Sequence, residues 1–143
     1  MRLYNRSISS YAERIADDRM VLGSFFIDTF HELNVTLEVH LPDLTILAAH
    51  AEMQRSPYPI CADVMKNVHA LVGKSAGAGI GKLARETLGG PQGCAHLEET
   101  LLEAVRSAIQ AEFVSSGIGL AEDEKVEVYR KKWQNTCYAW SRI

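Results

Sequence analysis

A glycine-rich turn constrains this 143-residue chain more than any other feature of its sequence. Three glycines and a proline lie within residues 89–93, a composition through which neither a helix nor a strand continues. An amphipathic run then extends over residues 95–113 and predicts a long helix. Cys94 and His96 therefore lie where a sharp turn enters a helix. The unpaired N–H groups and the positive dipole end at such a place favour the thiolate form of a cysteine.

Three runs with strand character precede this turn: residues 20–30, 33–41 and 44–53. The second alternates apolar and polar side chains with the period of a half-buried strand. Pro42 and Asp43 form a turn of hairpin length before the third run. Residues 1–19 have mixed polarity and favour a short helical face. The short connections predict a three-stranded antiparallel meander, one face of which needs a cover.

Four segments with helical character follow the strands: residues 61–72, 80–88, 95–113 and 122–133. This order predicts an α+β fold: a three-stranded antiparallel sheet with one face covered by helices and a long helix after the glycine-rich turn. We expect a single domain over residues 1–143. Its core should occupy about residues 20–114, and residues 115–143 should form a charged C-terminal appendage.

Composition and charge narrow the classes of function. Apolar residues make up 47% of the chain and charged residues 23%, which is typical of a soluble globular protein. The net charge of −3 gives no general attraction to nucleic acid or to an anionic membrane. No secretory signal and no bilayer-spanning apolar run is present, so we expect a cytoplasmic protein. The three cysteines are an odd number and far apart, which favours reduced thiols over a structural disulfide.

The candidate site combines Cys61, Cys94 and His96. Two thiolates and an imidazole are suitable ligands for zinc or an iron–sulfur species, so one hypothesis is a protein that binds or carries a metal or a sulfur species. A second hypothesis is a small enzyme that acts on a small molecule, with Cys94 as the nucleophile and His96 or His31 as the base. Cys61 remains a candidate catalytic residue as well. A third hypothesis is a non-catalytic accessory subunit with a protein partner, and a homodimer also remains open.

The segment 89–99 resembles the signature of a bacterial family known as domain of unknown function 2889. The shared pattern is a glycine-rich turn followed by Gly-Cys-x-His-Leu and an acidic residue, here centred on Cys94 and His96. Two further elements resemble the same family: His31-Glu32-Leu33 and Pro57-Tyr58-Pro59-Ile60-Cys61. The resemblance covers roughly residues 23–112. It supplies a candidate site but implies no agreed activity.

The expected layout also resembles that of iron–sulfur cluster scaffolds and their sulfur-acceptor relatives. On this likeness, Cys61 matches the cysteine after the third strand, and Cys94 with His96 matches the cysteine–histidine pair before the last long helix. Here the cysteine comes first and Ala95 separates the two, whereas the scaffolds have the histidine directly before the cysteine. This likeness concerns architecture, and function does not follow from architecture alone.

Overall fold

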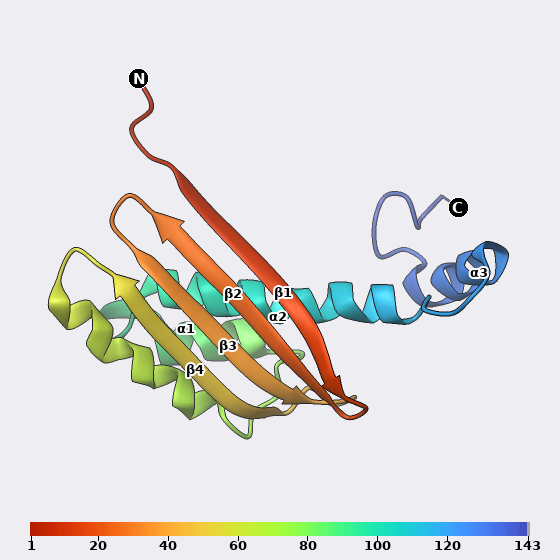
Figure 1. The fold of residues 1–143 in the computed structure, drawn as a ribbon, viewed down its shortest axis with the longest axis horizontal. Coiled ribbons are helices and arrows are strands. Elements are labelled where there is room, and N and C mark those ends of the chain that lie inside the picture. Colours follow the sequence, from red (N-terminus) through yellow and green to blue (C-terminus); the bar gives the residue numbers. More distant parts are fainter. Residues whose placement is uncertain (143) are drawn as a thin grey trace. The chain divides into compact units, whose positions relative to one another are not determined.

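The fold is α+β, with four strands followed by helices (Figure 1). The structure is a computed structural model that describes residues 1–142. The chain divides into two compact units, Met1–Ala108 and Ile109–Ile143. The elements, in chain order, are β1 (Arg6–Ala16), β2 (Arg19–Asp28), β3 (Glu32–His40), β4 (Ile46–Arg55), η1 (Pro59–Leu71), α1 (Ile80–Leu88), η2 (Gly90–Gln92), α2 (Ala95–Ser115) and α3 (Glu122–Trp133). The elements η1 and η2 are 3-10 helices.

The sheet of the first unit is antiparallel in the order β1-β2-β3-β4. An antiparallel sheet with helices is confirmed, but the expected number of three strands is wrong. The extra strand is β1, in the segment for which the sequence favoured a short helical face. Its Tyr11 lies opposite Gly23 of β2, and the Tyr11 ring occupies the space that a side chain at Gly23 would need. A strand at the edge of a sheet needs little apolar alternation, because only part of it is covered.

The strands β2 and β3 direct alternate side chains into the core. In β3 the buried side chains are those of Leu33, Val35, Leu37 and Val39, which confirms the alternation read from the sequence. In β2 the buried side chains in the same alternation are those of Met20, Leu22, Ser24, Phe26 and Asp28. Two of these five are polar, so β2 brings a hydroxyl and a carboxylate to the face that the other strands fill with apolar groups.

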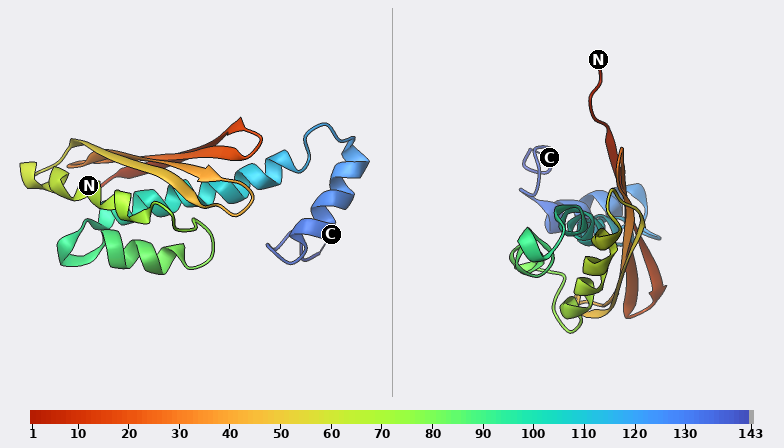
Figure 2. Two further views of the ribbon diagram at one scale, coloured as in Figure 1. Left: turned by 90° about the horizontal axis from the view of Figure 1, so that it is seen from below. Right: turned by 90° about the vertical axis from the view of Figure 1, so that its left-hand side faces the viewer.

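Helices lie on one side of this sheet: η1, α1 and the part of α2 up to Ala108 (Figure 2). Their buried side chains include Met65, Val68, Leu71, Ala84, Leu88, Leu97 and Leu101. The buried hydroxyl of Ser24 donates a hydrogen bond of 2.7 Å to the carbonyl of Thr100 in α2. Asp28 lies beyond Ser24 on the same face, at the end of β2, and His96 lies one helical turn before Thr100, at the beginning of α2. This hydrogen bond therefore brings the end of β2 close to the beginning of α2.

The second unit contains the end of α2, the helix α3 and the residues that follow it. Aromatic rings pack together there: Phe113 stacks on Tyr129 at 4.3 Å between ring centroids and also contacts Trp133 and Trp140. Glu112 forms an ion pair with Lys132. Among residues 1–142, no helix combines the length and the apolar character that crossing a membrane requires.

Candidate functional site

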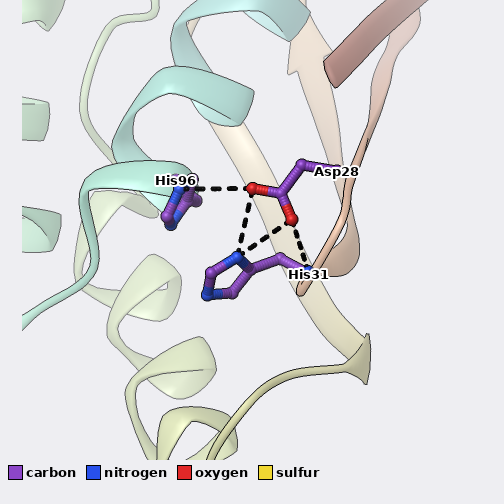
Figure 3. A group of neighbouring side chains, drawn as sticks. All are labelled: Asp28, His31 and His96. Atoms are coloured by element: carbon purple, nitrogen blue, oxygen red, sulfur yellow. Dashed lines mark hydrogen bonds and ion pairs between the residues drawn. The ribbon is translucent and has the colours of Figure 1, made fainter. Parts of the chain in front are cut away.

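Three side chains with metal-ligating atoms converge in the first unit: Asp28, His31 and His96 (Figure 3). One carboxylate oxygen and one nitrogen of each imidazole all lie within 4.8 Å of one another. Asp28 ends β2, His31 lies in the turn before β3, and His96 lies in the first turn of α2. No second group of three His, Cys, Asp or Glu side chains meets this distance within residues 1–142.

The turn between β2 and β3 fixes the position of Asp28. Its Oδ1 accepts hydrogen bonds from the backbone N–H groups of Phe30 at 2.7 Å and His31 at 2.5 Å. Such a bond from an aspartate to the backbone two residues later stabilises a tight turn. Arg55, at the end of β4, donates to the carbonyls of Thr29 at 2.7 Å and Asp28 at 2.8 Å. The carboxylate is therefore held by its own turn and by the neighbouring part of the sheet.

The imidazole of His31 lies directly beside this carboxylate. Its Nδ1 is 3.1 Å from Oδ1 and 3.3 Å from Oδ2 of Asp28, and its second nitrogen is directed away from Asp28 (Figure 3). The His31 ring stacks on the ring of His96, with centroids 4.1 Å apart and an angle of 30° between the planes. The side chain of Asp28 is only 2% exposed and that of His31 is 15% exposed.

His96 has a different partner at each of its two ring nitrogens. Its Nε2 is 3.8 Å from Oδ2 of Asp28, and its Nδ1 is 3.9 Å from Sγ of Cys94. The edge of the ring also contacts Phe26 of β2, with centroids 4.9 Å apart. His96 thus links a buried carboxylate on one side to a cysteine sulfur on the other.

The protonation states of this group follow from its surroundings. Burial alone would raise the pKa of Asp28, but hydrogen bonds from the His31 and Phe30 backbone, the Tyr4 hydroxyl and the His31 ring outweigh burial and lower the pKa to about 2. Burial is also the main reason that the pKa of His96 falls below its ordinary value, and the nearby His31 adds to the fall. The charge of Asp28 acts in the opposite direction on His96. At neutral pH the group therefore holds an anionic carboxylate and a neutral His96, which are the forms that bind metals.

The residues expected from the sequence occupy different places. Cys94 and His96 lie side by side, as described, and His31 belongs to the converging group. Cys61 is partly exposed in the first turn of η1, where its N–H donates to the carbonyl of Tyr58. Within the described residues, the ligand atoms of Cys61, Cys94 and His96 do not form a second group within 4.8 Å. Metal binding by those three residues stays a prediction.

Asp28 was not among the site residues predicted from the sequence. The expected strand over residues 20–30 included it, but only as the end of the strand. The sequence did contain one signal for it. Asp28 is separated from Leu22, Ser24 and Phe26 by even numbers of residues, so in a strand its side chain lies on the same face as theirs. A core that contains Leu22 and Phe26 therefore also receives the Asp28 carboxylate. All three cysteines of the described chain are free thiols, and Cys137 is exposed in the second unit.

The fold and the site together define a small α+β protein in which a carboxylate, two imidazoles and a cysteine meet between a strand end and a helix start. Residues 13–110 match the family model described as "Protein of unknown function (DUF2889)", so the chain belongs to this family. The matched segment contains Asp28, His31, Cys94 and His96. No curated protein and no solved structure matches the chain. The Gly-Cys-x-His-Leu element as the family signature, and the likeness to iron–sulfur scaffolds, stay predictions.

Proposed function

We propose that this protein binds one transition-metal ion through Asp28, His31 and His96, with zinc and iron as the candidates. The observation that carries the proposal is the convergence of three donor atoms within 4.8 Å around a buried carboxylate. The surrounding hydrogen bonds keep this buried carboxylate ionised, and an anionic oxygen next to two imidazoles is suited to hold a cation. This proposal keeps the expected class of function, metal binding, with a different set of ligands.

The separations between the donor atoms suit a metal ion. A tetrahedral ion with bonds of about 2.1 Å separates neighbouring ligand atoms by about 3.4 Å. The Nδ1 of His31 is 3.3 Å from Oδ2 of Asp28, and the Nε2 of His96 is 3.8 Å from the same oxygen. The third separation, between the ligand nitrogens of His31 and His96, lies within 4.8 Å, so the two imidazoles would move toward each other when all three atoms bind one ion.

Two imidazoles and one carboxylate form a ligand set that leaves part of the coordination sphere of the metal open. Three protein ligands leave one position of a tetrahedral ion, or more positions of a larger coordination sphere, for water or a substrate. Imidazole nitrogen suits zinc and iron, and the carboxylate reduces the net positive charge of the centre. Such a centre serves either to activate a bound molecule or to hold the metal as cargo.

Metal titration of the chelator-treated protein tests the proposal. We expect one zinc or iron ion per chain, measured by calorimetry and elemental analysis. Affinity should fall at least tenfold in each of Asp28→Asn, His31→Ala and His96→Ala. The matched control is His40→Ala, because His40 pairs with Asp43 three residues away at 2.8 Å in the same way that His31 pairs with Asp28. Equal binding by all five proteins, or none by the wild type, would contradict a site at Asp28.

A second candidate function rests on the same histidine. Sγ of Cys94, the two nitrogens of His96 and Oδ2 of Asp28 follow one another at 3.9 Å and 3.8 Å, in the order nucleophile, base and orienting carboxylate. This order is typical of enzymes that use an activated cysteine. The geometry favours His96 over His31 as the base, because His96 is the histidine beside the sulfur.

Thiol reactivity separates this candidate from metal binding. If Cys94 is an activated nucleophile, iodoacetamide should label it much faster than Cys61 and Cys137 near neutral pH, and His96→Ala should abolish the difference. Peptide mass spectrometry reads the three rates in one experiment. Slow and equal labelling of all three thiols would exclude the candidate and leave the metal proposal intact.

A further inference from the structure

A tyrosine from the N-terminal segment reaches the same carboxylate. The hydroxyl of Tyr4 donates a hydrogen bond of 3.0 Å to Oδ2 of Asp28, the oxygen that also faces Nε2 of His96 at 3.8 Å. Tyr4 lies 24 residues from Asp28 along the chain. Asp28 Oδ2 is therefore the point at which a phenol, an imidazole and a carboxylate meet.

The beginning of β1 is held where it presents this phenol to the site. Arg6 pairs with Glu99 of α2 at 2.8 Å, and Ser10 contacts Glu103 one turn further along the same helix. Tyr4 lies two residues before the first residue of β1, and its hydrogen bond to the buried Asp28 places its hydroxyl on the side of the sheet that the helices cover. The contact between Tyr4 and Asp28 thus continues a row of contacts between β1 and the core side of the first unit.

The distance between the two oxygens suits neighbouring ligands of one ion. In an octahedral complex with bonds of about 2.1 Å, adjacent ligand atoms lie about 3.0 Å apart. The phenol oxygen of Tyr4 is 3.0 Å from Asp28 Oδ2, and Nδ1 of His31 is 3.1 Å from Asp28 Oδ1. An ion bound to the carboxylate would accordingly lie within reach of the phenol oxygen after a small rotation of the Tyr4 side chain.

We propose that Tyr4 is a fourth protein ligand and that the site takes ferric iron as a tyrosinate complex. This inference rests on the proposed metal site at Asp28, His31 and His96. Binding breaks the phenol O–H bond, forms an Fe–O bond and releases the proton to water, with no change in the oxidation state of the iron. A phenolate and a carboxylate are hard oxygen donors that suit a trivalent cation, and tyrosine is an established protein ligand of iron. Two oxygen and two nitrogen ligands leave two octahedral positions for a small anion or water.

The ferric tyrosinate has a direct spectroscopic signature, because charge transfer from phenolate to iron absorbs visible light. The chelator-treated protein is titrated with ferric nitrilotriacetate in air and, separately, with zinc. We expect the wild type to develop a visible band that saturates at one iron per chain. Tyr4→Phe should lose the band and keep the circular dichroism spectrum of the wild type, since this change removes only one hydroxyl. The matched control is Tyr11→Phe, because Tyr11 stacks on the exposed Phe25 and should leave the band unchanged.

The outcomes separate this inference from the proposed function. If the wild type binds neither iron nor zinc, the metal site itself is refuted, and the ligand role of Tyr4 with it. If iron binds without a visible band, or if the band survives in Tyr4→Phe, Tyr4 is not a ligand although the metal site stands. An unchanged circular dichroism spectrum of Tyr4→Phe shows that a lost band does not come from misfolding.

Discussion

At the scale of single residues, Asp28 organises the site more than either histidine does. Its two carboxylate oxygens together contact the turn backbone, the His31 ring, the His96 ring and the Tyr4 hydroxyl. The histidines have fewer polar partners and take their orientation from this carboxylate. A change at Asp28 should therefore alter the stability of the fold and the chemistry of the site at the same time.

Asp28→Asn isolates the contribution of the negative charge, because the amide oxygen can still accept the backbone hydrogen bonds of the turn. The pKa of Asp28 lies at about 2, below the ordinary value of 3.8, so the ionised carboxylate stabilises the folded state above about pH 4. This stabilisation amounts to about 2 kcal/mol and is lost as the pH falls from 4 toward 2. Urea unfolding should show the Asp28→Asn variant less stable than the wild type at pH 6, with a smaller difference at pH 3.

The control for this prediction is Asp43→Asn. The pKa of Asp43 also lies at about 2, mainly because of its hydrogen bond with His40, but its side chain is 59% exposed. Solvent screens such a group, so its replacement should change the free energy of unfolding less than Asp28→Asn does. A stability difference at Asp28 that stays constant from pH 6 to pH 3 would contradict the assigned role of its charge.

The histidines and Cys94 were predicted from the sequence, and Asp28 was not. Cys94, His96 and His31 all lie beside turn signals, where reactive groups are commonly placed. Asp28 instead ends a strand, and whether such a residue faces the core depends on the phase of the whole strand and on which face the helices cover. Tyr4 was not predicted either. Its contact with Asp28 joins residues 24 positions apart, and it depends on the edge strand β1, which was not predicted from the sequence.

At the scale of secondary-structure elements, the turn before α2 decides where Cys94 and His96 lie. The backbone N–H of Cys94 donates to the carbonyl of Leu88, the last residue of α1, at 2.6 Å. A Cβ atom added at Gly93 would overlap the Leu88 carbonyl group. Gly93 adopts an extended conformation, so the requirement for glycine comes from this close approach and not from backbone strain.

Gly93→Ala should therefore open the turn and move Cys94 and His96 away from Asp28. We expect a loss of about 2 kcal/mol in the free energy of unfolding, typical of a steric overlap that the backbone must relieve, and weaker metal binding in the folded fraction. The control is Gly81→Ala in α1, where an added Cβ meets nothing within 4 Å and alanine favours the helix. Thermal unfolding of both variants tests this, and a Gly93→Ala protein as stable as Gly81→Ala would contradict it.

The elements illustrate what periodicity can and cannot predict. Strands β2 to β4 and helices α1 to α3 were predicted because each has an apolar face, a charged helical pattern or a turn signal at its ends. The edge strand β1 has neither clear alternation nor deep burial, so its sequence contains no strong strand signal. Its backbone pairing with β2 makes it a strand in spite of the local pattern, which favoured a helix. In β4, a register shift pairs Val39 with Ile46 and Glu38 with Ala48, which leaves Leu47 as an extra, exposed residue. Such a bulge changes the phase of a strand without a signal in its composition.

At the scale of the whole molecule, the division into two units falls inside α2. The sequence led us to expect a core up to residue 114 and an appendage from residue 115, and the single-domain organisation stays a prediction. The structure places the boundary after Ala108, the last deeply buried residue of α2. Every proposed ligand lies in the first unit, and the family match ends at residue 110. The two observations agree that the first unit carries the site.

This agreement predicts that the first unit with the whole of α2 is sufficient for folding and metal binding. A chain ending at Ser115 keeps the α2 side chains that pack on the sheet, among them Leu97, Leu101 and Ala104. It should unfold cooperatively within a few degrees of the full chain and bind one metal ion with an affinity within about twofold. A chain ending at Gln92 loses α2 and exposes the apolar side chains beneath it, so it should not fold.

Circular dichroism melting and zinc titration of the two shortened chains, beside the full chain, test this prediction. Failure of the longer fragment to fold would show that Met1–Ala108 depends on residues after 115. A folded longer fragment that binds no zinc, while the full chain does, would place an essential ligand or support in the second unit. Either result would refute the assignment of the complete site to the first unit, because that assignment requires Asp28, His31 and His96 to act without any residue beyond α2.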